Sequence, residues 1–272
     1  MRTVLITNGN LLSLLSLGDW LRRHHAHLAA VLVTTRLPSQ KNNVVGVLSM
    51  LRASGWGYTH FKLLTNVLLP RKLRRMGLPA SVEDYLRRLG SPADIWPTPY
   101  VNRPEVVERV RSLKPEILMS FSATTRFKDP LLETPTRAAI NTHYALLPAY
   151  AGLSPYFWYL RNRERECGVT LHRIVPKLDA GPIIEQQRFS TAGLRTVFAV
   201  LREQIARVSP MLNRYYANET SEHNATPQDL SRRSYFGHPT RADVRALRAG
   251  GHTFYDRSDL DAVIERLRGL TS

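Results

Sequence analysis

Residues 3–35 read TVLITNGNLLSLLSLGDWLRRHHAHLAAVLVTT, and they give the clearest indication of the fold. A short β-branched and apolar run ends at Asn8-Gly9-Asn10, leucines then recur at roughly helical spacing as far as Arg23, and residues 28–35 are almost continuously apolar. A continuous apolar run is typical of a strand that is buried on both faces of a parallel sheet. The stretch therefore predicts a strand, a helix and a second, parallel strand.

The same alternation continues along the chain and predicts an α/β fold with a mostly parallel sheet. Further strands are expected at 116–121, 138–141, 169–175 and 183–189, and helices at 104–114, 155–163 and 197–216. Pro210 is expected to kink or split the last of these helices. We expect one main domain over residues 1–210, followed by a short tail of helix and loop over residues 211–272.

The composition is that of a globular protein with a strongly basic surface. The chain has 272 residues, 38 Lys and Arg against 22 Asp and Glu, and a formal net charge of +16. That balance suits either a polyanionic partner or a generally solvated basic surface. A single cysteine, Cys167, allows no internal disulfide, and no apolar run reaches membrane-spanning length. We expect a cytoplasmic protein without a membrane partner.

Three polar residues are the candidates for chemistry. Asn141 and His143 lie two apart at the end of a predicted strand, so they share a face at the sheet edge where ligands normally bind. Asp179 begins Asp179-Ala180-Gly181, in which the small residues permit a tight turn. Each also has a structural interpretation, as a hydrogen-bonded strand-end histidine or as an aspartate that closes a hairpin. His172 on the preceding strand is expected to be structural.

Other chemistries lack their sequence signatures. Neither the dinucleotide-binding glycine pattern nor a phosphate-binding loop with Gly-Lys-Ser/Thr is present, and there is no Gly-x-Ser-x-Gly nucleophile motif. Cys167 has no evident neighbouring base. His24, His25 and His27 do not have the spacing of metal ligands, so we expect no metal.

Four segments in this order resemble the folate-dependent formyltransferases. They are Asn141-Thr142-His143, residues 146–152 (LLPAYAG), residues 168–172 (GVTLH) and residues 178–184 (LDAGPII). That family includes glycinamide ribonucleotide, methionyl-tRNA, amino-sugar and hydroxyornithine formyltransferases, and the resemblance covers about residues 1–210. It implies a Rossmann-like sheet in a catalytic domain, with N10-formyltetrahydrofolate as the formyl donor.

The resemblance also implies roles for particular residues. Asn141, His143 and Asp179 would form the catalytic set, and the donor would be surrounded by Met119, Phe121, Arg126, Phe127, Lys128, Leu178 and Asp179. These catalytic roles agree with the chemistry, since an amide and a protonated imidazole can donate hydrogen bonds to the oxyanion that forms when an amine attacks a formyl group. Asp179 can pair with the imidazolium or accept the proton of the amine. Many relatives carry Arg or Lys where this chain has Ala151, beside the site.

The acceptor is open at this stage. We favour the amine of a small molecule, such as a nucleotide-linked amino sugar, whose phosphates the basic excess would help to hold. Alternatives are an aminoacyl-tRNA, a hydroxylated amine such as hydroxyornithine, hydrolysis of the donor, or a non-catalytic basic binding protein. The relatives that act on tRNA carry a carboxy-terminal β-barrel, whereas residues 211–272 read as helix and loop, which disfavours tRNA. Residues 36–92 and 218–240 are expected to determine acceptor specificity.

Overall fold

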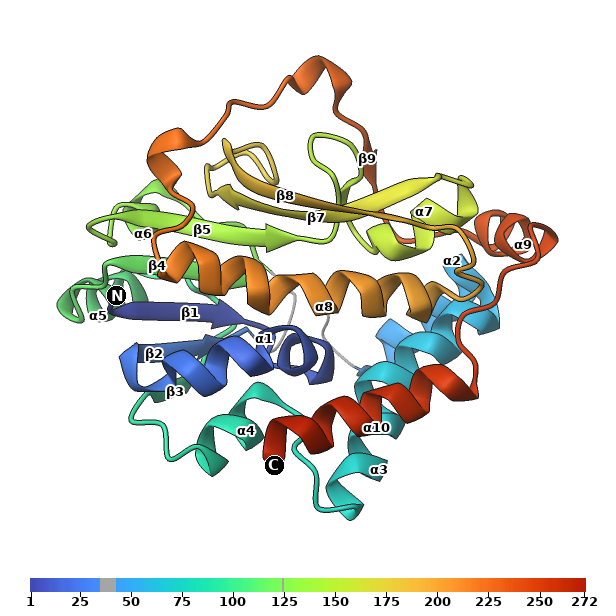
Figure 1. Ribbon diagram of the computed structural model, residues 1–272, viewed down its shortest axis with the longest axis horizontal. Helices are drawn as coiled ribbons and strands as arrows, with labels where there is room; N and C mark the ends of the chain where they lie inside the picture. Colours follow the sequence, from blue (N-terminus) through green and yellow to red (C-terminus); the bar gives the residue numbers. More distant parts are fainter. Residues whose placement is uncertain (35–42, 124) are drawn as a thin grey trace.

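The computed structural model describes residues 1–34, 43–123 and 125–272, and in this part of the chain seven strands form one sheet. The order is β3-β2-β1-β4-β5-β7-β8 (Figure 1). The strands are β1 (Thr3–Thr7), β2 (Leu28–Val33), β3 (Asp94–Pro97), β4 (Ile117–Phe121), β5 (Ala138–His143), β7 (Glu166–Arg173) and β8 (Ile183–Ser190). Strands β1 to β5 pair in parallel, and β7 and β8 are antiparallel additions at one edge. The predicted α/β fold is confirmed.

Helices cover both faces of this sheet. Strand residues alternate between two apolar clusters: Leu5 faces the cluster that includes α1 and α8, whereas Val4 and Ile6 face the cluster that includes α5. The remaining elements are α1 (Leu11–His24), α2 (Asn43–Leu63), η2 (Leu64–Leu68), α3 (Leu69–Arg75), α4 (Val82–Arg88), α5 (Pro104–Ser112), α6 (Asp129–Leu132), β6 (Ala151–Gly152), α7 (Pro155–Arg161), α8 (Val197–Tyr216), β9 (Tyr235–Phe236), α9 (Arg241–Ala249) and α10 (Arg257–Thr271), with short turns η1 (His25–His27), η3 (Glu222–Asn224) and η4 (Leu230–Arg232).

Two local features differ from what the sequence indicates. Helix α8 runs through Pro210 as a single element, because the buried side chains Val208, Met211 and Leu212 on either side of the proline hold it against the core. The sequence pattern assigns no element to residues 94–97. They form β3 at the edge of the sheet, where a proline leaves no ladder hydrogen bond unmade.

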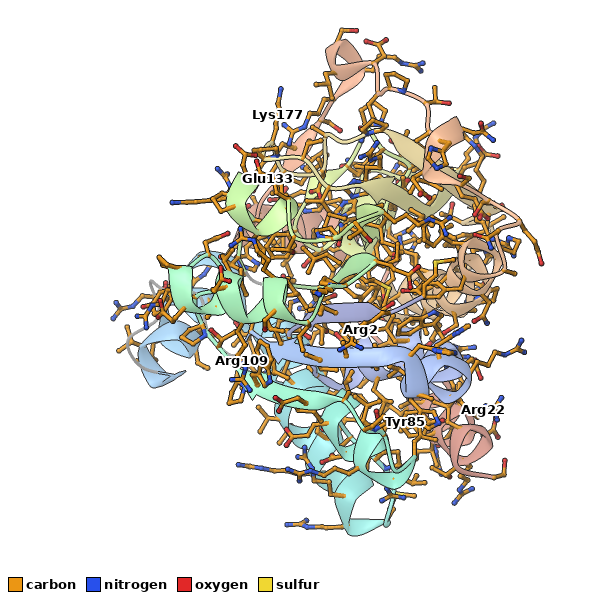
Figure 2. The ribbon with its side chains drawn as sticks, turned by 90° about the vertical axis from the view of Figure 1, so that its left-hand side faces the viewer. Arg2, Arg22, Tyr85, Arg109, Glu133 and Lys177 are labelled. Atoms are coloured by element: carbon orange, nitrogen blue, oxygen red, sulfur yellow. The ribbon has the colours of Figure 1, made fainter. Side chains whose placement is uncertain are left out.

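The carboxy-terminal segment belongs to the core. Val263, Leu267 and Leu270 of α10 are buried in the same apolar cluster as α1. The Tyr85 hydroxyl donates a hydrogen bond to the Leu270 carbonyl oxygen at 3.0 Å, and Figure 2 shows Tyr85 beside this helix. The proposed boundary at residue 210 falls within α8. Among the described residues, no helix has both the length and the apolar character needed to cross a membrane.

Candidate active site

Asn141, His143 and Asp179 come together at the end of β5. The nearest approach of His143 to Asp179 is 3.8 Å, between Nδ1 and Oδ1. Asn141 lies on the same strand, and its Nδ2 is 3.1 Å from Nε2 of His172 on the neighbouring strand β7. The structure thus assembles the three residues that the sequence suggested for catalysis, together with a second histidine.

His172 holds the Asn141 amide. Its Nδ1 donates to the Arg173 carbonyl oxygen at 2.7 Å, so Nε2 carries a lone pair and accepts the hydrogen bond from Asn141 Nδ2. Burial lowers the pKa of His172 to about 4, against the opposing effect of the nearby Asp179 carboxylate, so the ring is neutral at pH 7. The sequence alone predicts only a structural role for His172. Its place directly opposite Asn141 depends on the register between β5 and β7, which the sequence does not display.

A main-chain carbonyl fixes the orientation of His143. Its Nε2 lies 3.0 Å from the Tyr150 carbonyl oxygen, and since a carbonyl can only accept, Nε2 carries a proton. Nδ1 therefore faces Asp179. At 3.8 Å the two are too far apart for a direct hydrogen bond, but they form an ion pair once Nδ1 is protonated.

The turn around Asp179 brings its carboxylate close to the end of β5. Asp179 has a φ of +52°, unusual for a non-glycine residue, and its Oδ2 accepts a hydrogen bond from the Gly152 N–H at 3.0 Å. A Cβ at Gly181 would collide with the Arg173 carbonyl oxygen, so this turn requires glycine there. The short Ala-Gly sequence after the aspartate thus allows the carboxylate to reach the end of β5.

Residues 226–238 contact both loops of the site, the turn at Asp179 and the loop at Tyr150. Gln228 Nε2 donates to the carbonyl oxygens of Asp179 and Gly181, at 3.1 and 2.6 Å. Ser234 Oγ accepts a hydrogen bond from the Tyr150 N–H at 2.9 Å, and β9 pairs in parallel with β6. The sequence predicts only that this segment belongs to a tail of helix and loop and that residues 218–240 help to determine acceptor specificity. The alternation of turn residues gave no signal that it holds the catalytic loops.

The residues suggested for donor binding fall into two groups. Met119 and Phe121 are buried in β4 and Phe127 is buried below the following loop, so these side chains belong to the apolar core. Arg126 and Lys128 are exposed, and the main chain at both residues is hydrogen-bonded to Asn102.

These positions fit a donor bound through main-chain groups and through the two cationic side chains. Leu178, next to Asp179, is partly exposed, and its carbonyl oxygen accepts a hydrogen bond from Arg233 at 3.1 Å. The role of all these residues in donor binding stays a prediction.

Lys62 places an ammonium group near the loop that holds Asp179. Its Nζ donates to the hydroxyl oxygens of Tyr156 at 2.8 Å and of Ser154 at 3.4 Å, and Tyr58 hydrogen-bonds to Ser154 and to His238. Burial alone would lower the pKa of Lys62, but the two tyrosine hydroxyls more than offset it and the pKa is raised. Among the described residues, no carboxylate lies within 4.0 Å of this ammonium.

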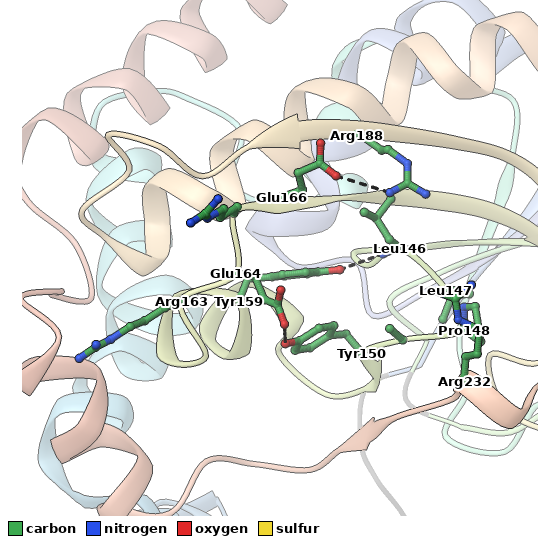
Figure 3. A pocket seen from close by; sticks show the side chains of 12 residues that line it. Leu146, Leu147, Pro148, Tyr150, Tyr159, Arg163, Glu164, Glu166, Arg188 and Arg232 are labelled. Atoms are coloured by element: carbon green, nitrogen blue, oxygen red, sulfur yellow. Dashed lines mark hydrogen bonds and ion pairs between the residues drawn. The ribbon is translucent and has the colours of Figure 1, made fainter.

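A separate pocket lies at Tyr150, the residue whose carbonyl oxygen contacts His143. It has a volume of about 580 Å³ and is bounded by residues 146–150 on one side and by the paired side chains of Glu166 and Arg188 on the other (Figure 3). Tyr150 contributes its ring to this pocket and its carbonyl oxygen to His143, whereas Asn141, His143 and Asp179 do not line the pocket.

Comparison with known proteins identifies the class. Residues 70–200 match the family model described as formyl transferase. An N-formyltransferase from Helicobacter canadensis, solved in complex with folinic acid and dTDP-3-aminofucose, has a similar structure with 19% identity and a TM-score of 0.55, over 88% of this chain and 71% of that chain.

Two further solved structures are similar. Glycinamide ribonucleotide transformylase 1 from Symbiobacterium toebii shares 18% identity with a TM-score of 0.53, over 84% of this chain and 94% of that chain. A sugar N-formyltransferase from a Shewanella species shares 14% identity with a TM-score of 0.54, over 92% of this chain and 87% of that chain. At these identities the structural likeness shows the fold. Together with the match over residues 70–200, it confirms the resemblance to formyl transferases seen in the sequence.

Proposed function

We propose that this protein is an N10-formyltetrahydrofolate-dependent N-formyltransferase that formylates an amine of a small molecule, such as a nucleotide-linked amino sugar. The observation that carries this proposal is the grouping of Asn141, His143 and Asp179 at the end of β5. The Helicobacter canadensis protein, which has the same fold, was solved with folinic acid and an amino sugar linked to dTDP, which supports the choice of both substrates.

The three side chains suit the transfer of a formyl group to nitrogen. The donor supplies an electrophilic formyl carbon. As the acceptor nitrogen bonds to that carbon and the carbonyl electron pair moves to oxygen, the second N–H of the Asn141 amide and the protonated Nδ1 of His143 donate to the oxyanion. Asp179 accepts the proton that the acceptor nitrogen loses. The bond from the formyl carbon to N10 then breaks, and this proton ends on N10.

The neutral His172 ring orients the side-chain amide of Asn141 so that it can donate a hydrogen bond to the substrate. Because His172 Nε2 can only accept, it fixes which end of the Asn141 amide is the NH₂ group, and one of the two amide hydrogens is left for the substrate. A protonated His172 would instead repel the NH₂ group and turn it away. The low pKa of this buried histidine, about 4, keeps the donor end of the amide in place at neutral pH.

Lys62 supports an acceptor with a negative charge. Its ammonium has hydroxyl partners but, among the described residues, no carboxylate within 4.0 Å, and its side chain keeps partial exposure. It lies at Ser154, two residues from the Gly152 N–H that holds Asp179. We propose that it attracts an anionic group of the acceptor, and that it offsets the absence of a basic residue at Ala151.

Donor binding is the first test because it requires no knowledge of the acceptor. Calorimetric titration with a stable formyltetrahydrofolate analogue should show saturable binding, and the exposed pair Arg126→Ala and Lys128→Ala should weaken it. The exposed His27→Ala, far from the site along the chain, is the matched control. If the analogue does not bind the wild-type protein, the donor assignment is wrong.

Transfer is tested next with nucleotide-linked amino sugars, by the release of tetrahydrofolate and the mass of the product. Asp179→Asn should abolish turnover while donor binding persists. Lys62→Met should raise KM for a phosphorylated acceptor with little change in donor affinity. Release of tetrahydrofolate that does not depend on an amine would replace transfer with hydrolysis, and an unchanged KM in Lys62→Met would remove the role given to that residue.

A further inference from the structure

The outward face of α2 is apolar, which is unusual for a helix on the surface of a globular protein. Val45 and Leu48 are 61% and 48% exposed, and Trp56, after the break at Gly55, is 62% exposed. Val45, Leu48 and Arg52 recur at helical spacing, so they share one face of the first half of the helix. A solvent-facing stripe normally carries charged residues, and here Arg52 alone does so.

The same combination of apolar and basic side chains continues into the next two elements. Leu68 of η2 and Met76, which follows α3, are 47% and 41% exposed. Between them, Arg71, Lys72 and Arg75 are exposed on α3. The segment from α2 to α3 therefore carries both exposed apolar and exposed basic side chains.

No acidic residue lies within α2, η2 or α3. Between Asp19 and Glu83 the sequence contains ten Lys and Arg and no Asp or Glu. Five of these cations are exposed on α2 and α3, namely Arg52, Arg71, Lys72, Arg74 and Arg75, and of these Arg74 pairs with Asp84 at 3.1 Å. Exposed large apolar side chains that accompany cations, with no acid in the same elements, are candidates for an interaction surface.

Helix α9 adds a basic rim. It lies beside α2 at the edge of the molecule (Figure 1), where Arg241 donates a hydrogen bond to the Leu51 carbonyl oxygen at 3.1 Å. Arg245 and Arg248 are also exposed on α9. The acid of this helix, Asp243, is bonded to Arg161 at 3.0 Å and to the helix cap. The α9 guanidinium groups thus border the apolar stripe.

We propose that this face, formed by α2, η2, α3 and the exposed side of α9, binds peripherally to a membrane that contains anionic lipid. Anionic headgroups would meet the arginines and lysines, while Leu48 and Trp56 enter the boundary between headgroups and acyl chains, where tryptophan is favoured. A second copy of the chain is a poor occupant, because two copies with a formal charge of +16 repel each other. A nucleic-acid backbone would engage the cations but leave the apolar stripe exposed to water.

This proposal revises the expectation that the protein has no membrane partner. That expectation rested on the lack of a spanning segment, and peripheral binding needs none. It is independent of the proposed formyl transfer and can fail without affecting it. Its test accordingly measures binding alone.

The test is flotation of the full-length protein with vesicles of phosphatidylcholine, with and without phosphatidylglycerol, combined with tryptophan fluorescence. We expect binding only to the anionic vesicles, weaker at high salt, with a blue shift from Trp56. The other three tryptophans, all within the described residues, are at most 8% exposed. The double variant Leu48→Gln and Trp56→Ser should weaken binding at least about tenfold through the lost apolar contact. Arg52→Glu with Arg245→Glu should weaken it through charge.

The matched controls are Leu230→Gln, at a 37% exposed leucine outside the patch, and Arg111→Glu on α5, which Figure 1 places at the opposite end of the molecule. Both should bind like the wild type. Thermal unfolding checks that each variant is folded. If the double variant with Trp56→Ser does not fold, the single variant Leu48→Gln replaces it. Absence of vesicle binding, equal loss in Arg111→Glu, self-association that Leu48→Gln abolishes, or RNA binding in place of vesicle binding would each overturn the proposal.

Discussion

The acid sensitivity of the fold should depend on His172. An unfolded histidine has a pKa of about 6.5, and burial lowers the folded value to about 4, so between these values the unfolded chain binds the additional proton. The free energy of unfolding is therefore highest above pH 6.5, falls as the pH drops toward 4, and levels off below it. A difference of about 2.5 pKa units corresponds to about 3 kcal/mol in all, of which about 2 kcal/mol is lost between about pH 7 and about pH 5.

His172→Gln removes this titration while keeping the hydrogen-bonding pattern. The amide oxygen can accept from Asn141, and the amide NH₂ can donate to the Arg173 carbonyl, as the neutral imidazole does. We expect the variant to be less stable than the wild type at pH 7 by about 1 kcal/mol, through imperfect packing. Between about pH 7 and about pH 5, the unfolding free energy of the variant should fall by about 2 kcal/mol less than that of the wild type. The difference between the two proteins should shrink or reverse.

The assay is urea unfolding at the two pH values and fixed ionic strength, followed by fluorescence of the buried tryptophans. His27→Gln, at an exposed histidine, is the control and should show the pH dependence of the wild type. Other titrating groups are common to all three proteins and cancel in the comparison. The reasoning is refuted if His172→Gln loses as much stability as the wild type on acidification, or if NMR titration of the folded protein gives His172 an unperturbed pKa.

Three further predictions concern the site. His143→Asn should lower kcat by about 10²–10³ with unchanged donor affinity, since one oxyanion donor is weakened, and equal losses in kcat and donor affinity would contradict this role. Gly181→Ala should lower the unfolding free energy by about 1–3 kcal/mol, because the added methyl group meets a main-chain carbonyl. The control is Gly269→Ala in α10, where a Cβ has free space. In the same denaturation experiment it should raise the unfolding free energy by up to about 1 kcal/mol. Gln228→Ala should cost about 1–2 kcal/mol for its two hydrogen bonds and also lower kcat, because the turn of Asp179 is released; a loss of stability without a loss of kcat would limit Gln228 to a structural role.

The local part of the fold could be predicted from the sequence. The first strand has the predicted bounds, Thr3–Thr7, and the first helix begins at Leu11, because apolar runs, Asn8-Gly9-Asn10 and helical spacing are signals within a few residues of one another. Asn141 and His143 could be proposed for the same reason, since they end an apolar run. The helix over residues 197–216 was also predicted, but Pro210 does not split it, because packing on both sides of the proline outweighs its local effect.

What could not be predicted depends on contacts between distant segments. His172 lies opposite Asn141 only through the antiparallel register of β5 and β7. The Tyr150 carbonyl meets His143 only because the intervening loop folds back. Neither a register nor a loop path leaves a periodic pattern in the sequence. The acid-free span was visible in the sequence, but its meaning required the structure to show which apolar side chains it leaves exposed.

The tail shows why the geometry of the candidate active site depends on more than the sheet. Asp179 adopts a positive φ that costs an L-residue about 1 kcal/mol or more, so the turn would relax if nothing held it. Its carboxylate is held by the Gly152 N–H and its carbonyl oxygen by Gln228, while Ser234 holds the main chain at Tyr150, whose carbonyl orients His143. Two of these four contacts come from residues beyond 216, where α8 ends. The segment that the sequence suggests is an appendage therefore supplies part of the free energy that keeps the carboxylate and the imidazole facing each other.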